Sequence, residues 1–233
     1  MSNTLGKLYI VATPIGNLGD MTFRAVDVLK SVDCILCEDT RTTKKLLDHY
    51  GITNKTMSFH SHSGLSRVSD IVSMIHEGKS LALVSDAGTP CISDPGVMLV
   101  AELYKQCGND FETIAVPGAS ALISALSISG LPTHEFIWKG FAPHKKGRKT
   151  FFEDIAEIAV TVVFYESVHR NEKALESMEE VIPDRQVVVA RELTKTFEET
   201  IRGTPSEITA YFANHPEKVK GEFVVMVAPK NWK

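Results

Sequence analysis

Short apolar runs alternate with longer amphipathic segments through the first half of the chain. The runs are rich in Val, Ile and Leu, which predicts buried strands, and the segments between them repeat apolar residues at helical spacing. A strict alternation of strands and helices is typical of a parallel sheet covered by helices. We expect strands at 7–13, 33–37, 56–59, 81–84 and 111–116, and helices at 22–30, 42–50, 66–78 and 97–106.

The second half has a different rhythm, because its strands follow one another more closely and predict a mixed sheet. We expect strands at 136–141, 161–165, 186–190, 198–202 and 222–228, and helices at 120–129, 151–159 and 206–212, with a further helix ending at 181. Thr22 and Ser206 are the expected N-caps of their helices. The change of rhythm predicts two α/β domains, 1–116 and 117–233.

Composition limits the partners of the chain. Its 233 residues are 43% hydrophobic and carry a formal net charge of −4. This balance argues against bulk attraction to nucleic acid, so any RNA contact must come from a local basic patch. No apolar run reaches the length of a membrane span, and the N-terminal run is too short and wrongly flanked for a signal peptide. We therefore expect a cytoplasmic protein that does not bind membranes.

The cysteines and histidines do not predict a metal site. Cys34 and Cys37 form a CxxC pair within an expected strand, where residues three apart point to opposite faces. They are predicted to be free core thiols. His60 and His62 follow the next strand without a third ligand beside them, so we expect a loop there.

The stretch from Leu81 to Gly96 is the first candidate for a binding site. It begins as a buried strand and runs into the turn residues Asp86, Gly88 and Thr89. Ligands of parallel α/β sheets bind beyond the carboxyl ends of strands, although an ordinary βα loop has the same turn residues. The second turn cluster, 93–96, is interpreted as the start of the next helix.

Other expected strand ends carry polar or small residues as well. Glu38, Asp39 and Arg41 follow the second strand. They either face the same cleft as Asp86 or form a helix N-cap and a surface ion pair. The loop at 14–20 follows the first strand, but it does not match GxGxxG, and the chain contains no GxxxxGK[ST]. Both absences disfavour NAD and a nucleoside triphosphate held in a P-loop. Small residues at 117–121 open a helix, where a ligand can approach free backbone N–H groups.

The most basic segment is 144–149, between an expected strand and the next expected helix. A charge run is ordinarily a solvated loop. In an acidic protein, a basic loop is also a reasonable contact for RNA phosphates. The predicted RNA contacts are the cationic side chains of this loop together with one further arginine: Lys145, Lys146, Arg148, Lys149 and Arg41.

Eight segments, in order along nearly the whole chain, resemble the tetrapyrrole methylase superfamily. They are TPIGNLGDMTFRA, CEDTRTTKKLL, LVSDAGTPCISDPG, VPGASA, GFAPHKKGR, FYESVHR, ARELTK and KGEFVV. Within that superfamily, the set is similar to the bacterial enzymes that methylate a cytidine ribose 2′-oxygen in 16S ribosomal RNA of the small subunit. Many members carry a further small C-terminal region after the strand that begins KGE.

The resemblance implies a fold, a cofactor and an assembly. The fold is two α/β domains with an interdomain cleft, the cofactor is S-adenosylmethionine, and the assembly is a homodimer. By the same resemblance, nine positions hold the methyl donor: Pro14, Asp86, Gly88, Thr89, Ser120, Ala121, Tyr165, Ala190 and Gly221. A carboxylate such as Asp86 suits the donor's α-amino group, and an anionic pocket suits its sulfonium.

The 2′-hydroxyl is a poor nucleophile until its proton is drawn away, so a base or polarising group is expected. The candidates at strand ends are Asp39, Glu192, Lys195 and Glu222, with Glu166 beside them. A lysine serves as a base only if its pKa is depressed. Arg41, Arg170 and Arg191 are candidate clamps for phosphate or carboxylate, or else form salt bridges across the domain interface. Two alternatives stay open: a tetrapyrrole acceptor, and a non-catalytic RNA-binding assembly protein.

Overall fold

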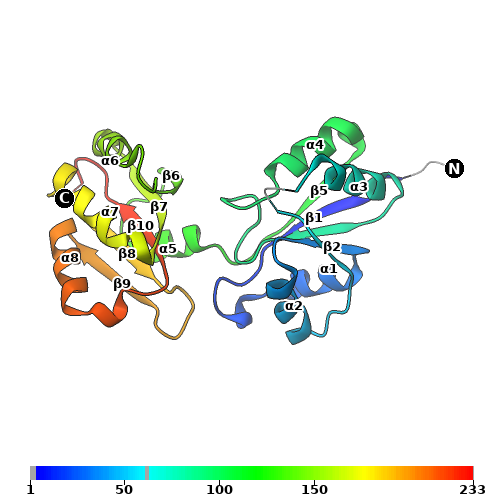
Figure 1. Ribbon diagram of the computed structural model, residues 1–233, viewed down its shortest axis with the longest axis horizontal. Helices are drawn as coiled ribbons and strands as arrows, with labels where there is room; N and C mark the ends of the chain where they lie inside the picture. The colour runs from blue at the N-terminus through cyan, green and yellow to red at the C-terminus, as the bar shows by residue number, and fades with distance from the viewer. Residues whose placement is uncertain (1–3, 61–62, 233) are drawn as a thin grey trace. The chain divides into compact units, whose positions relative to one another are not determined.

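The computed structural model describes residues 4–60 and 63–232, and only the backbone at 168–171. His62 lies outside the described residues, and His60 lies in a loop, as expected. The chain separates into two compact units, Met1–Ser120 and Ala121–Lys233 (Figure 1). The sequence predicts the boundary after residue 116, at the start of the loop that contains this division. In the described part of the chain, no helix combines the length and apolar character that a membrane crossing requires.

The N-terminal unit contains a five-stranded sheet of order β3-β2-β4-β1-β5 in which all pairings are parallel. The expected parallel sheet is therefore confirmed. Its strands are β1 (Lys7–Val11), β2 (Cys34–Cys37), β3 (Thr56–Ser58), β4 (Leu81–Val84) and β5 (Glu112–Val116). Its helices are α1 (Phe23–Ser31), α2 (Thr40–His49), α3 (Leu65–His76) and α4 (Val97–Cys107).

Two apolar cores lie on opposite faces of this sheet. Helices α3 and α4 cover one face, and α1 and α2 cover the other (Figure 1). Side chains alternate between the faces of a strand, so Cys34 packs in the first core and Cys37 in the second. Both thiols are free and buried, which confirms the prediction of core cysteines on opposite faces.

The C-terminal unit contains a mixed five-stranded sheet of order β6-β7-β10-β8-β9, as expected. Strand β6 is parallel to β7, and the other pairings are antiparallel. The strands are β6 (Phe136–Phe141), β7 (Thr161–Ser167), β8 (Val187–Arg191), β9 (Glu199–Gly203) and β10 (Glu222–Val227). The helices are α5 (Ala121–Ser129), α6 (Arg148–Glu157), α7 (Val168–Val181) and α8 (Pro205–Asn214).

One large apolar core holds the C-terminal unit together. Helices α6, α7 and α8 bury Phe152, Leu175 and Phe212 against β7, β8 and β10. Helix α5 packs against β10 and β8 and buries Leu122 and Leu126. Helices thereby cover the sheet, and loops lie at the ends of its strands.

The helix starts show which local signals decide a boundary. Thr22 caps α1 as expected, since its hydroxyl accepts from the Ala25 N–H at 3.1 Å. The prediction that Ser206 caps α8 is wrong, because Thr204 does so. Thr204 and Glu207 form a reciprocal capping box around a proline at the first helical turn, an arrangement that satisfies otherwise unpaired N–H groups.

Candidate functional site

The loops after β1 and β4 are joined at the carboxyl edge of the N-terminal sheet. Thr13 and Gly88 form an antiparallel bridge, in which each N–H donates to the other carbonyl, at 2.9 and 3.0 Å. The Thr13 hydroxyl also donates to the Ser85 carbonyl at 3.2 Å. The bridge places Pro14, the residue after Thr13, beside the loop that carries Asp86. Gly88 has a φ of +79°, which is strained for any residue with a Cβ.

A third loop, after β5, joins the same edge. The Thr89 hydroxyl donates to the Ala119 carbonyl at 3.2 Å, which fixes the segment that ends at Ser120. Gly118 lies so close to the first strand's loop that an added Cβ would meet the Ala12 Cβ at 3.0 Å. The structure therefore brings together the predicted positions Pro14, Gly88, Thr89 and Ser120 within one unit.

The loop after β2 reaches Asp86 directly. The Asp39 N–H donates to Asp86 Oδ1 at 3.2 Å, so the two segments meet at one edge of the sheet. Asp39 also caps α2 and pairs with the exposed Arg41, which is the other arrangement that the sequence left open. The Asp39 carboxylate is held by Arg41, whose Nε and Nη2 donate at 3.1 and 2.8 Å. Those hydrogen bonds lower the pKa of Asp39 to about 2. A carboxylate with so low a pKa is a weak base at neutral pH.

Three carboxylates crowd this edge, and we call Glu38, Asp86 and Asp94 the acidic edge. Burial, with the charges of Glu38 and Asp86, raises the pKa of Asp94 to about 6. Burial and then the charge of Asp86 raise the pKa of Glu38. Like charges in a half-buried site disfavour one another, so a cation placed here would be stabilised. The expected helix-starting turn at 93–96 is confirmed, since α4 begins at Val97, but the proximity of Asp94 to this edge was not predicted.

Three of the positions predicted to hold the donor, Tyr165, Ala190 and Gly221, lie together in the C-terminal unit. Tyr165 and Ala190 both pair with Val224, one from each neighbouring strand of β10. Gly221 immediately precedes β10 and has a φ of +89°, and a Cβ there would overlap Glu192 Oε1. The Tyr165 hydroxyl accepts from the Leu122 N–H at 3.1 Å, at the start of α5 where Ala121 lies.

Three of the candidate catalytic residues form one ionic cluster beside Gly221. Lys195 Nζ lies 2.9 Å from Glu192 Oε1 and 2.8 Å from Glu222 Oε2. Burial alone would lower the pKa of Lys195, but hydrogen bonds and charges from Glu222 and Glu192 outweigh it and raise the pKa. Lys195 is therefore protonated at neutral pH and acts here as a cation.

The basic segment divides into exposed and buried cations. Lys145, Lys146 and Lys149 are exposed. The side chain of Arg148 is only 10% exposed, and its Nη2 lies 3.0 Å from Glu166 Oε2, which is fully buried. The prediction that Arg148 contacts RNA phosphate does not fit this burial, because the guanidinium is already committed to a carboxylate inside the unit. The same pair leaves Glu166 poorly placed to act as a base.

The remaining arginine candidates differ in placement. The Arg41 side chain is 88% exposed beyond its pair with Asp39. Arg191 is 5% exposed and donates to the Phe197 carbonyl at 3.0 Å and to Glu199 at 3.4 Å. This ion pair lies inside the C-terminal unit, so it differs from the salt bridge across the domain interface that the sequence left open. The Arg170 side chain lies outside the described residues.

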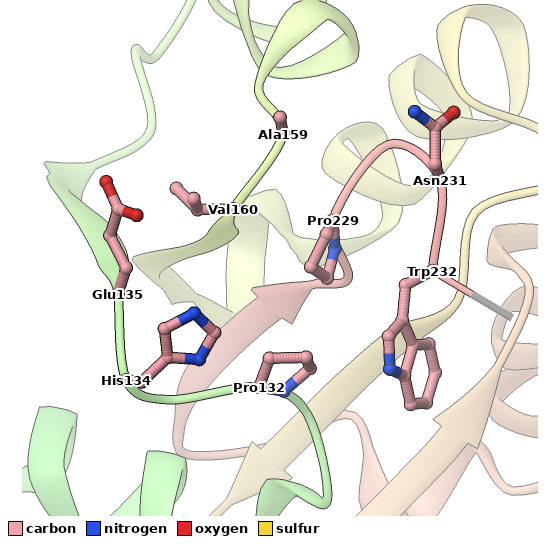
Figure 2. Close-up of a pocket in the computed structure, with 8 residues that line it drawn as sticks. All are labelled: Pro132, His134, Glu135, Ala159, Val160, Pro229, Asn231 and Trp232. Carbon is pink, nitrogen blue, oxygen red and sulfur yellow. The ribbon is translucent and has the colours of Figure 1, made fainter.

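A pocket of about 320 Å³ lies elsewhere in the C-terminal unit (Figure 2). Its lining includes residues just before β6 and β7 and just after β10, at the strand ends opposite to Tyr165 and Gly221. The lining residues are Pro132, His134, Glu135, Ala159, Val160, Pro229, Asn231 and Trp232. None of the predicted site residues is among them. Among the side chains that the structure describes, which exclude those at 61–62 and 168–171, no group of three His, Cys, Asp or Glu is placed to hold a metal ion.

Solved structures share this fold at low sequence identity. A cobalt precorrin-4 methyltransferase superposes with a TM-score of 0.68 at 19% identity, covering 95% of this chain and 94% of that one. A diphthine synthase superposes with a TM-score of 0.71 at 12% identity, covering 96% and 90% of the two chains. These likenesses confirm the predicted fold class of two α/β domains.

Curated relatives are much more similar in sequence. The protein called ribosomal RNA small subunit methyltransferase I from Vibrio cholerae is 50% identical to this chain, over 94% of this chain and 76% of that protein. The protein of the same name from Streptococcus pyogenes is 49% identical, over 97% of this chain and 77% of that protein. The protein of that name from Bacillus subtilis is 45% identical over 97% and 76%. The model of the tetrapyrrole (corrin/porphyrin) methylases matches residues 7–209. The chain therefore belongs to the tetrapyrrole methylase family.

Proposed function

We propose that the chain is an S-adenosylmethionine-dependent methyltransferase that methylates the ribose 2′-oxygen of a cytidine in 16S ribosomal RNA of the small subunit. The observation that carries this proposal is the identity of 45% to 50% over nearly the whole chain with ribosomal RNA small subunit methyltransferases. The family match supports methyl transfer, and the motif resemblance supports the ribose acceptor.

The N-terminal unit offers a chemical fit to the donor. S-adenosylmethionine is cationic at its sulfonium and its α-amino group, and the acidic edge of Glu38, Asp86 and Asp94 supplies the opposite charge. Asp86 is exposed at this edge and is the residue we assign to the amino group. The bridge between Thr13 and Gly88 fixes the backbone of both loops, and Pro14 and Thr89 directly follow the two bridged residues. Ser120 follows Ala119, whose carbonyl accepts from the Thr89 hydroxyl.

The C-terminal unit offers backbone and aromatic surface for the adenosyl part of the donor. We assign this contact to the backbone near Tyr165, Ala190 and Gly221, with Ala121 at the start of α5. Gly221 is required there because a Cβ would overlap Glu192. The donor, when bound, supplies an activated methyl group, so the protein's contribution is alignment and handling of the hydroxyl proton.

The ionic cluster around Lys195 is assigned to the acceptor hydroxyl. As a cation, Lys195 polarises the hydroxyl oxygen and favours loss of its proton, which passes to Glu222, while Glu192 holds Lys195 in place. Glu222 is 78% exposed and can meet a substrate, whereas Glu192 is 18% exposed. Asp39, with its pKa near 2, has a binding role through Arg41 rather than a role as the base.

The test supplies a donor with a deuterated methyl group to small ribosomal subunits that lack the modification, to naked 16S RNA and to corrin precursors. We expect label on a cytidine ribose of the assembled subunit, located by mass spectrometry of nuclease fragments. Label on a corrin would instead establish the tetrapyrrole acceptor. If calorimetry detects no binding of S-adenosylmethionine while the protein still binds RNA, the protein is a non-catalytic assembly protein.

Two further parts of the proposal concern assembly and location. We propose a homodimer in the cytoplasm, on the motif resemblance and on the ribosomal substrate. Light scattering of the purified protein at several concentrations measures the assembly. A monomer at all concentrations that still transfers methyl groups would remove the dimer from the proposal.

A further inference from the structure

Phe141 is a large aromatic side chain left half exposed at the end of an edge strand. It is 52% exposed, at the carboxyl end of β6. Its ring nevertheless has a fixed neighbour, because it meets the Tyr165 ring edge to face with centroids 5.4 Å apart. Tyr165 in turn meets Trp138 edge to face at 4.4 Å. The inner rings of this trio are packed, and the outer ring presents a surface to solvent.

The backbone around Phe141 is held on both sides. Phe141 pairs with Tyr165 after a register shift from Trp138, and the Ala142 N–H donates to the Tyr165 carbonyl at 3.3 Å. Further along, Arg148 Nε donates to the Pro143 carbonyl at 3.0 Å. Arg148 is itself fixed by its buried pair with Glu166. The loop that follows Phe141 is therefore anchored at its root by a group inside the core.

That anchored loop carries exposed positive charge. Lys145 and Lys146 follow Phe141 and are exposed, and Lys149 is exposed on the first turn of α6. The ion pair of Lys149 with Glu180 is 3.5 Å long between side chains that are each about two-thirds exposed, so it leaves the lysine available. In a chain of net charge −4, an aromatic ring beside three exposed lysines is a local feature and not a property of the whole surface.

We propose that Phe141 stacks on an unpaired base of the acceptor RNA while Lys145 and Lys146 contact the flanking phosphates. This inference rests on the proposed function and describes how the protein holds the RNA substrate. Proteins bind single-stranded RNA by combining base stacking on aromatic rings with cations along the phosphates, and every base offers a face for stacking. A protein partner is the less suitable occupant, because lysines are depleted at the centres of protein interfaces.

The experiment compares Phe141→Ala and Phe141→Trp in the full chain, with Phe23→Ala as the matched control. Phe23 is 93% exposed in the N-terminal unit and has no part in the proposed site. Binding of small subunits and of a single-stranded 16S fragment is measured at several salt concentrations, and donor binding by calorimetry. We expect Phe141→Ala to weaken RNA binding about tenfold with an unchanged salt slope, and Phe141→Trp to restore it.

A second pair of variants separates stacking from charge. Lys145→Gln and Lys146→Gln should each reduce the salt slope by about 0.7 for a single-stranded contact. Donor affinity and the thermal midpoint should stay at the wild-type values in the two lysine variants and in Phe23→Ala. Phe141→Ala also loses the ring contact with Tyr165, so its thermal midpoint should fall slightly, and Phe141→Trp should restore it. The subsite is refuted if Phe141→Ala binds RNA as tightly as Phe23→Ala does. If wild-type protein binds RNA but transfers no methyl group to it, the proposed function fails. The comparison of Phe141→Ala with Phe23→Ala still tests the stacking subsite in that case.

Discussion

The charges at the edge of the N-terminal sheet are arranged differently from those of the C-terminal unit. Glu38, Asp86 and Asp94 are neighbouring carboxylates, and burial and mutual repulsion raise the pKa values of Glu38 and Asp94. In the C-terminal unit, carboxylates lie against cations instead, as in the buried pair of Arg148 and Glu166. A buried pair such as this one holds the fold, whereas an uncompensated group of one sign is arranged to receive a ligand of the other sign. The cluster around Lys195 differs from the buried pair, because Glu222 is 78% exposed and can meet a substrate. The comparison thus separates structural charges from candidate binding charges.

The largest expected effect is on stability, from breaking the buried pair. Arg148→Met leaves the buried carboxylate of Glu166 without its cation, and we expect a loss of about 3–5 kcal/mol in the free energy of unfolding. The double variant Arg148→Met with Glu166→Leu should recover much of that loss, because both charges are gone. Urea unfolding measures both. A loss as small as that of the exposed neighbour Lys149→Met would contradict the structural role of the pair.

The next effect concerns the close approach at Gly221. Gly221→Ala places a methyl group against Glu192 at a φ of +89°, so we expect a loss of about 2–3 kcal/mol and weaker donor binding. Gly51→Ala is the matched control, since Gly51 has a φ of +62° with nothing within 4 Å of the added Cβ. That control should lose only about 1 kcal/mol. Equal losses in the two variants would show that backbone strain alone matters at Gly221.

A smaller effect is expected in the pH dependence of stability. The folded-state pKa of Asp94, about 6, lies above its ordinary value of 3.8. The contribution of Asp94 to stability is therefore fully present below pH 3.8 and is lost as the pH rises through 6. Asp94→Asn should stabilise the protein at pH 8 by about 1 kcal/mol after screening by solvent, and should change little at pH 3.5. Thermal unfolding across this range provides the check, and a gain that does not depend on pH would contradict it.

The smallest effect is expected at an exposed pair. Lys149→Gln removes an ion pair with Glu180 between largely exposed side chains, so the stability should change by less than about 0.5 kcal/mol. RNA binding should still weaken, with a salt slope lower by about 0.7. A large loss of stability in Lys149→Gln would show that this exposed charge is also structural, and would contradict the distinction between structural and binding charges.

Much of the fold was readable from local patterns, and the exceptions have identifiable causes. Short apolar runs and their spacing predicted both sheets. The two-residue period of a strand predicted the opposite orientations of Cys34 and Cys37. The start of α8 was misassigned although its signal was present, since Thr204 with Glu207 three residues on is a capping box.

The candidate site was less predictable, because its chemistry depends on contacts distant in sequence. A run such as KKGRK does not distinguish Arg148 from its neighbours, and only the buried Glu166 does so. Asp94 reads as a turn residue until Glu38 and Asp86 are placed near it. Lys195 likewise reads as a possible base until its two carboxylate neighbours are known.

The most direct test of the distinction between paired and uncompensated charge is donor affinity in two matched variants. Asp86→Asn removes a carboxylate of the acidic edge, and Asp39→Asn removes one that is already neutralised by Arg41. Calorimetric titration with S-adenosylmethionine should show a loss of more than about tenfold for Asp86→Asn and a change of less than about threefold for Asp39→Asn. Wild-type affinity in Asp86→Asn, or the larger loss in Asp39→Asn, would contradict the assignment of the donor to this edge.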